Sequence, residues 1–149
     1  MPSNYDPKDG DIIYGPFAND YSQHNAVLLH IVEGVVYLFP ISSREQTMNY
    51  YLDTDSAAVV RLSEEEIKEI FRSGAKEVSF IYCGKRNIIT KSKVELLAMV
   101  ENGQAKVRRA RASEDLIERI VFGVMNSRTN DQDLVDRILG KRTDIFQNV

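Results

Sequence analysis

The sequence contains little of what disulfide-bonded and metal-binding proteins need. It has one cysteine, Cys83, among 149 residues, and no tryptophan. A lone cysteine cannot form an intramolecular disulfide, and with only two scattered histidines it offers no zinc-binding pattern. We therefore expect a protein that uses neither a structural metal nor a cofactor.

Long hydrophobic runs are also missing. No apolar stretch approaches the roughly 20 residues that a membrane-spanning helix needs. The first residues, Met1 to Asp6, lack the basic start and the apolar run of a secretion signal. These absences predict a soluble, cytoplasmic protein without a membrane partner.

Size and composition favour one domain. The chain has a mass of 17.0 kDa and is 43% hydrophobic, which suffices for a core of its own. No tract rich in glycine, serine or proline divides it. We expect a single domain over residues 1–149, with a core from about residue 10 to residue 140 and a short flexible tail at 141–149.

Charge is balanced overall but not along the chain. The formal net charge of -3 indicates no particular partner. Residues 85–111, however, hold eight basic and only two acidic side chains. Such a segment could follow an RNA backbone, because neutralising phosphates releases condensed counterions. It is equally well explained as a solvated face that pairs with acidic residues of the chain or of a partner.

Strands dominate the first half of the sequence. The run Asp11–Phe17 is rich in β-branched and aromatic residues and predicts a short first strand. The runs Ala26–Val32 and Val35–Ile41, joined through Gly34, predict a hairpin. Both arms are apolar at nearly every position, so both faces should be covered. Either a small closed barrel or a sheet with helices laid on it would do this.

Helices dominate the second half. Ser63 and Glu66 match a capping box, which predicts a helix that ends near Gly74, and Ser92 and Glu95 form a second such pair. Further helices are predicted after residue 113 and over residues 130–139, and further strands within 76–83 and 86–90. The expected fold is α+β: a strongly curved antiparallel sheet of about five to seven strands with one inserted helix and C-terminal helices.

Three blocks of the sequence, taken in order, carry a resemblance to a known family. They are Gly10–Tyr14, the run from Asn25 to Ser43, and Cys83–Lys93. Over residues 10–122 the chain resembles the MazF/PemK-like toxins, and at Pro40–Glu45 it resembles their ToxN-like branch. The resemblance implies an SH3-like barrel, a homodimer, metal-independent cleavage of single-stranded RNA, and a cognate antitoxin, protein or RNA, as partner.

The resemblance also implies catalytic residues. By the ToxN-like match, Ser42 and Ser43 would donate hydrogen bonds to phosphate oxygens, and Arg44 would stand near an assisting lysine of that branch. His24, in the polar loop before the second strand, is a candidate general acid or base. The alternative is that the serines bond to local backbone at a strand end and that His24 and Arg44 are solvated surface side chains.

The sequence differs from the family at positions where the family has catalytic residues. Asn25 stands where the family has an arginine, and Tyr82 and Gly84 flank the cysteine where some members carry an arginine and an aspartate. Metal-free cleavage needs a base for the 2′-OH proton and donors for the leaving 5′-oxygen and the phosphorane. The usual acid and base are therefore replaced in this chain.

Candidate RNA-binding residues lie later in the sequence. Tyr82 would supply a ring for base stacking, and the cations that would hold the backbone are Lys85, Arg86, Arg108 and Arg109. A strand-end aromatic and a solvated hairpin tip explain Tyr82, Lys85 and Arg86 equally well.

Two functions follow from these observations. The leading hypothesis is a metal-independent endoribonuclease of toxin-antitoxin type that acts on single-stranded RNA. The alternative is a non-catalytic RNA- or protein-binding regulatory module on the same barrel, encoded by a phage or a plasmid.

Overall fold

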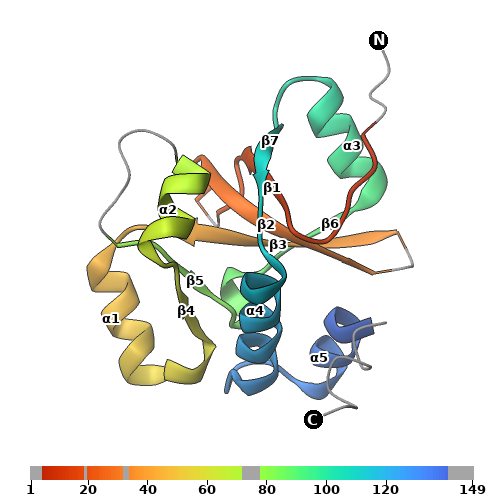
Figure 1. Cartoon of the computed structure of the whole chain (residues 1–149). Helices are drawn as coiled ribbons and strands as arrows, with labels where there is room; N and C mark the ends of the chain where they lie inside the picture. The colour runs from red at the N-terminus through yellow and green to blue at the C-terminus, as the bar shows by residue number, and fades with distance from the viewer. Residues whose placement is uncertain (1–4, 19, 32–33, 72–77, 141–149) are drawn as a thin grey trace.

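The computed structural model describes residues 5–18, 20–31, 34–71 and 78–140, and it has an α+β architecture (Figure 1). In these residues a seven-stranded antiparallel sheet is combined with five α-helices. The strands are β1 (Asp11–Gly15), β2 (His24–Ile31), β3 (Val35–Ser42), β4 (Val59–Arg61), β5 (Phe80–Tyr82), β6 (Ile89–Ser92) and β7 (Lys106–Arg111). The helices are α1 (Glu45–Thr54), α2 (Glu64–Phe71), α3 (Lys93–Glu101), α4 (Glu114–Asn126) and α5 (Gln132–Leu139), with short 3-10 turns η1 (Ser56–Ala58) and η2 (Lys85–Asn87).

Strand β3 is the centre of the sheet. The strand order is β4-β5-β3-β2-β1-β7, and β6 also pairs with β3. One edge of β3 pairs with β2 from Val35 to Pro40. The other edge is shared, because Val35–Leu38 pair with β6 and Ile41–Ser42 pair with β5. Two consecutive strands, separated by the 3-10 turn η2, therefore continue one another along the same edge.

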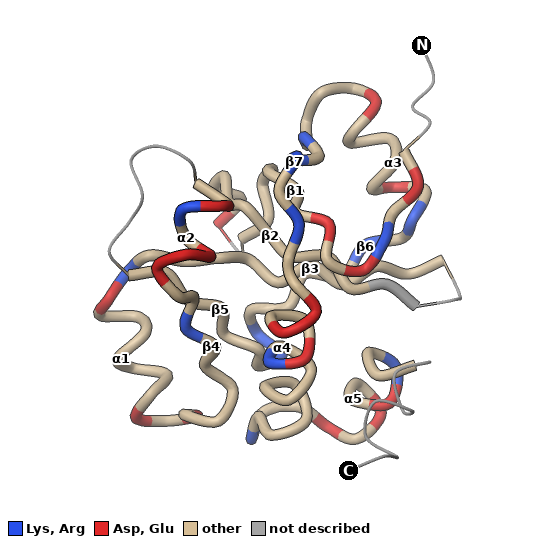
Figure 2. Tube along the Cα trace, in the orientation of Figure 1, with Lys and Arg blue, Asp and Glu red and all other residues tan. Residues whose placement is uncertain are grey.

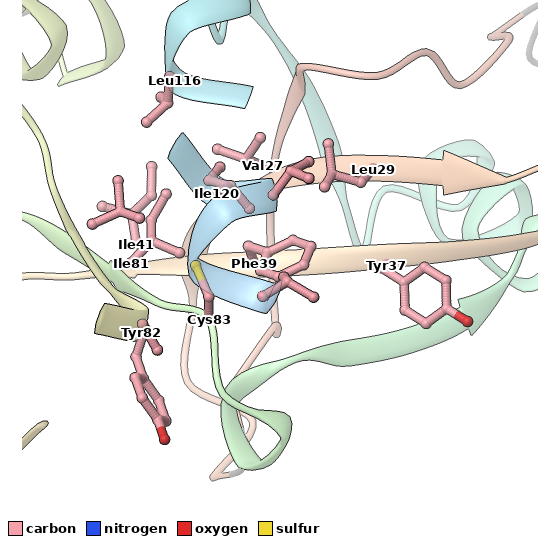
Figure 3. Close-up of a cluster of buried hydrophobic side chains, with 14 of the residues drawn as sticks. Val27, Leu29, Tyr37, Phe39, Ile41, Ile81, Tyr82, Cys83, Leu116 and Ile120 are labelled. Carbon is pink, nitrogen blue, oxygen red and sulfur yellow. The ribbon is translucent and has the colours of Figure 1, made fainter. Parts of the chain in front are cut away.

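The predicted hairpin is confirmed, and both of its faces are covered. On one face Val27, Leu29 and Phe39 join a core that includes Leu116 and Ile120 of α4 (Figure 3). On the other face, Leu28, Val36 and Leu38 join a second core with Leu96 of α3. Alternate residues of one strand point to opposite faces, so an unbroken apolar run is what a sheet covered by helices on both sides requires.

The expected closed barrel is not what the strand pairings give. Among the described strands, the sheet runs from β4 at one end to β7 at the other, and these two strands do not pair with each other. Instead, α2 contacts β7, so a helix lies beside that end of the sheet. The coarser prediction of an α+β protein with an antiparallel sheet is confirmed.

Local capping signals located three helices. At the start of α2, the Glu66 N–H donates to Ser63 Oγ at 3.2 Å and the Ser63 N–H donates to Glu66 Oε1 at 2.8 Å, which is the predicted capping box. Ser92 and Ser113 each accept a hydrogen bond from a backbone N–H in the first turn of α3 and α4. The predicted helix end at Gly74 and the flexible tail at 141–149 lie outside the described residues.

The short strand β4 was not predicted from the sequence, and neither were two longer elements. Helix α1 follows Arg44, which gives it no side-chain cap, and the only buried residue of the helix is Met48. Strand β7 is cationic, and five of its six residues are exposed. Strand β7 lacks the apolar alternation by which a strand is recognised, and α1 has only one short apolar stripe, Met48, Tyr51 and Leu52, among polar residues.

Candidate functional site

The ends of β2 and β3 bring together four residues that the sequence singled out. The two strands are antiparallel with Ala26 opposite Pro40, so the start of β2 at His24 and the end of β3 at Ser42 meet at one end of the sheet. His24 Nδ1 lies 3.0 Å from the carbonyl oxygen of Ile41. Ser43 and Arg44 follow directly, before α1 begins. The candidate catalytic residues are thus neighbours, although His24 is 18 or more positions from the others in the sequence.

Hydrogen bonds fix the orientation of the His24 ring. A carbonyl oxygen only accepts, so Nδ1 carries a hydrogen and donates it to Ile41. The other ring nitrogen, Nε2, lies 3.0 Å from Ser22 Oγ. Ser22 Oγ in turn donates to Asp20 Oδ1 at 2.6 Å. A carboxylate, a hydroxyl and an imidazole therefore lie in a row that ends at the edge of the sheet.

Two hydrogen bonds from Ser22 hold Asp20 in its charged form. The hydrogen bond from the Ser22 hydroxyl, followed by that from the Ser22 backbone N–H at 3.0 Å, lowers the pKa of the Asp20 carboxyl. Sequence reasoning missed Asp20 and Ser22. The signal that could have found them is the Asp-Tyr-Ser spacing, because an aspartate that accepts from the residue two positions later makes a tight turn.

The residues after β3 offer hydrogen-bond donors. Ser42 is half-buried, Ser43 and Arg44 are exposed, and the Arg44 N–H lies 3.5 Å from Ser42 Oγ. The first backbone N–H groups of α1 also receive no side-chain cap. Hydroxyls, a guanidinium and uncapped N–H groups are the donors that bind phosphate oxygens.

Tyr82 does not fit its predicted role. Its residue is only 2% exposed, and its ring stacks on Tyr51 with the ring centres 3.6 Å apart. The hydroxyl donates to Asp55 Oδ2 at 2.7 Å. Figure 3 shows the ring next to the hydrophobic core. The ring faces are occupied by the fold, so Tyr82 is removed from the set of base-stacking residues.

The predicted RNA-binding cations lie on two separate elements. Lys85 and Arg86 are exposed on η2, and the Lys85 backbone N–H donates to Thr129 Oγ1 at 3.1 Å, beside the connection from α4 to α5. Arg108 and Arg109 are exposed on β7. Figure 2 shows basic residues along β6 and β7.

Three of the four cations of strand β7 lack an acidic partner among the described residues. Within the described part of the chain, no ion pair joins Lys106, Arg108 or Arg109 to a carboxylate, whereas Arg111 contacts Asp11 at 3.4 Å. A cleft of about 250 Å³ runs between α2 and β7 and is lined by residues 106–110 of β7 and by Glu69 and Ile70 of α2. The exposed cations of β7 suit a polyanion, although the carboxylate of Glu69 lines the same cleft.

A larger cleft, of about 600 Å³, lies elsewhere, between α2 and α4. None of the predicted site residues lines it. Its Arg119 is already bonded to Glu66, Asp115 and the carbonyl oxygen of Arg61. The polar groups of this cleft thus join α4 to α2 and β4, which is a structural role.

The described residues show neither a metal-binding cluster nor a membrane-spanning helix. Among the residues that the structure describes, no three His, Cys, Asp or Glu side chains are grouped as a metal site would require. No helix in the same residues is long and apolar enough to cross a membrane. Comparison with known proteins gives no relative either: no protein-family model, no curated protein and no solved structure matches this chain.

Proposed function

We propose that this protein binds single-stranded RNA and cleaves it without a metal ion at the joined ends of β2 and β3. The observation that carries the proposal is the His24 imidazole, oriented by Ile41, beside Ser42, Ser43 and Arg44. An oriented imidazole next to hydroxyl and guanidinium donors is the set of groups that metal-free phosphodiester cleavage uses. A cognate antitoxin and a homodimer belong to the same proposal.

The proposed reaction assigns a step to each group. His24 Nε2 takes the proton of the ribose 2′-OH as its oxygen attacks phosphorus, and the P–O5′ bond breaks. The leaving 5′-oxygen takes a proton from a water molecule, and His24 then returns the proton it took to solvent. The products are a cyclic phosphate and a 5′-hydroxyl. Ser42, Ser43 and Arg44 donate to the non-bridging oxygens. Ser22, which faces Nε2, must move aside for the substrate.

The cations of β7 and η2 would guide the RNA. Lys106 and Arg108 lie on the same side of β7, because they are two positions apart in a strand. Each phosphate that such residues neutralise releases counterions, so we expect the affinity to fall steeply with salt.

We also propose a more specific fold than the α+β class. We take the described sheet to be a variant of the SH3-like barrel of the MazF/PemK-type, opened where α2 lies beside β7. Support comes from the shared edge of β3, which pairs with β6 in its first half and β5 at its end, as a sharply curved sheet would.

A non-catalytic RNA-binding module is the second candidate. The observation that favours it is the contact between Ser22 Oγ and His24 Nε2, which occupies the nitrogen that catalysis needs. Asn25, at the position of the family's arginine, is buried and therefore offers no exposed replacement. Such a module would use the β7 cations and hold RNA intact.

Turnover separates the two candidates. Purified protein is incubated with a long RNA of mixed sequence in EDTA, and 5′ ends are mapped over time. A nuclease at this site gives discrete cuts that disappear in His24→Ala and in the double variant Ser42→Ala/Ser43→Ala, while the exposed Ser56→Ala variant retains them. Intact RNA with the folded wild type would overturn the nuclease and favour the binding module. Cuts that persist in the double variant would remove the two serines from the reaction.

A further inference from the structure

Tyr21 is the most exposed of the large hydrophobic side chains in the described residues. Its residue is 80% exposed. It lies in the loop between β1 and β2, three positions before His24. A tyrosine this exposed buries little surface in the fold, so core packing does not explain its presence.

The backbone of Tyr21 is strained. Its φ angle is +60°, and it is the one non-glycine residue in the described chain with a positive φ. A Cβ makes this left-handed region unfavourable, and glycine or asparagine adopts it with less strain. The turn would therefore form more easily without an aromatic residue at this position.

Hydrogen bonds hold the strained residue in place from both sides. The Tyr21 N–H donates to the carbonyl oxygen of Ala18 at 2.9 Å, and Asp20 accepts two hydrogen bonds from Ser22. Before the turn, Phe17 is fully buried in the core under α3. After it, His24 is fixed on β3. The turn is thus anchored on both sides, and the ring is presented to solvent from a fixed backbone.

We propose that Tyr21 is a stacking platform for an unpaired nucleobase next to the candidate cleavage site. The proposal rests on the RNA-directed function argued above. Stacking needs an exposed π face, and every base can use it, which suits single-stranded RNA. The neighbouring His24, Ser43 and Arg44 supply the polar contacts to the adjacent phosphate and ribose. Tyr82, which the sequence suggested for this role, is buried and already stacks on Tyr51, so it cannot offer an exposed face to a base.

The test measures binding separately from cleavage. The probe is a single-stranded 2′-O-methyl RNA of about ten nucleotides, which cannot be cut by attack of the 2′-OH, with one 2-aminopurine as a fluorescent base. Binding is followed by anisotropy, and stacking by quenching of the 2-aminopurine. Tyr21→Phe keeps the ring, whereas Tyr21→Gly removes the ring and the backbone strain. Tyr50→Ala removes another exposed ring, on α1, as the matched control.

Loss of one stacked base should weaken binding by about 5- to 150-fold, the range that the usual stacking contribution corresponds to. We expect this loss, and loss of the quenching, in Tyr21→Gly. Tyr21→Phe and Tyr50→Ala should bind like the wild type, and Tyr21→Gly should melt no lower than the wild type because strain is relieved. Tyr21→Asn, which also tolerates the left-handed region, gives a second ring-free variant should the glycine variant misfold.

The outcomes separate this inference from the proposed nuclease. If the wild type binds the probe and the folded ring-free variants bind it equally well, the stacking platform is wrong and the nuclease is unaffected. If the variants lose binding but the wild type cleaves no RNA, the platform stands and the nuclease is wrong. If the wild type neither binds nor cleaves RNA, both are overturned, and a protein partner becomes the explanation for the exposed ring.

Discussion

Replacing Asp55 with alanine should be among the most destabilising single changes in this protein. Asp55 follows α1 and is 4% exposed. Its carboxylate accepts hydrogen bonds from the Tyr82 hydroxyl at 2.7 Å, the Ser127 hydroxyl at 2.5 Å and the Arg128 backbone N–H at 2.9 Å. One buried side chain thus joins the end of α1, strand β5 and the connection between α4 and α5.

The expected loss follows from these three bonds. Hydrogen bonds to a charged group contribute about 1.5–3 kcal/mol each, but their donors regain some partners when the carboxylate is removed. Ser127 Oγ, for example, lies 3.1 Å from Thr129 Oγ1. The buried Tyr82 hydroxyl has less opportunity to find water. We therefore expect Asp55→Ala to lower the free energy of unfolding by about 3–5 kcal/mol, out of the roughly 5–15 kcal/mol of a typical domain.

Urea unfolding followed by far-UV circular dichroism measures this loss directly. Asp53→Ala is the matched control, because Asp53 is an exposed aspartate two positions earlier, in the last turn of α1. The control should stay within about 0.5 kcal/mol of the wild type. Tyr82→Phe keeps the ring on Tyr51 and removes one donor. It should cost about 1–2 kcal/mol in the wild type and less in the Asp55→Ala background, because the interaction is then already lost.

The same carboxylate predicts how stability depends on pH. Burial alone would raise the pKa of Asp55, but the hydrogen bonds from Ser127, Arg128 and Tyr82 outweigh it and the pKa is lowered. The stabilisation is therefore present above the unfolded pKa of about 4 and is lost as the pH falls through the lower folded value. Asp55→Asn should lack this part of the acid sensitivity. A loss below about 1 kcal/mol in Asp55→Ala, or an unchanged acid profile in Asp55→Asn, would refute the reasoning.

Three further predictions concern helix packing and helix ends. A Cβ on Gly123 of α4 would lie 2.8 Å from Cys83 Sγ, so Gly123→Ala should cost about 1–3 kcal/mol in thermal melting, and adding Cys83→Ala should restore part of it. Ser113→Ala removes the cap of α4 and should cost about 1 kcal/mol in urea unfolding, whereas Ser113→Asp should retain most of it. Arg119→Lys loses the forked contacts to Glu66 and Asp115. Because Arg119 is one-third exposed, we expect a loss of only about 1 kcal/mol, and an unchanged melting temperature would contradict a role for the fork.

Features set by neighbouring residues were predictable from the sequence. The Ser63 and Glu66 pair located α2 because a capping box is a property of four consecutive residues. The β2–β3 hairpin was recognisable because its apolar runs flank one glycine, and the covered faces followed from the lack of alternation.

Features that depend on residues far apart in the sequence could not be predicted from it. Tyr82 reads as an exposed strand end until Tyr51 and Asp55, some thirty positions earlier, are placed beside it. Closure of the sheet depends on where α2 packs, which no local pattern encodes. At the candidate site, His24 and the serines were predicted from the sequence. The contacts of Asp20 and Ser22 with His24 were not, because the orientation of the His24 ring depends on its hydrogen bond to Ile41.

The cationic end strand of the sheet has a consequence for solubility. Among the described strands, β7 pairs only with β1, and wherever α2 does not cover it the other side of such an end strand is where another chain can add itself and begin to aggregate. Four of its six residues are Lys or Arg, so two copies repel each other along this strand at low ionic strength, and salt weakens that protection. The charges that we assign to RNA would thus also keep the protein monodisperse when RNA is absent. Removing them should lower the concentration at which the protein stays soluble.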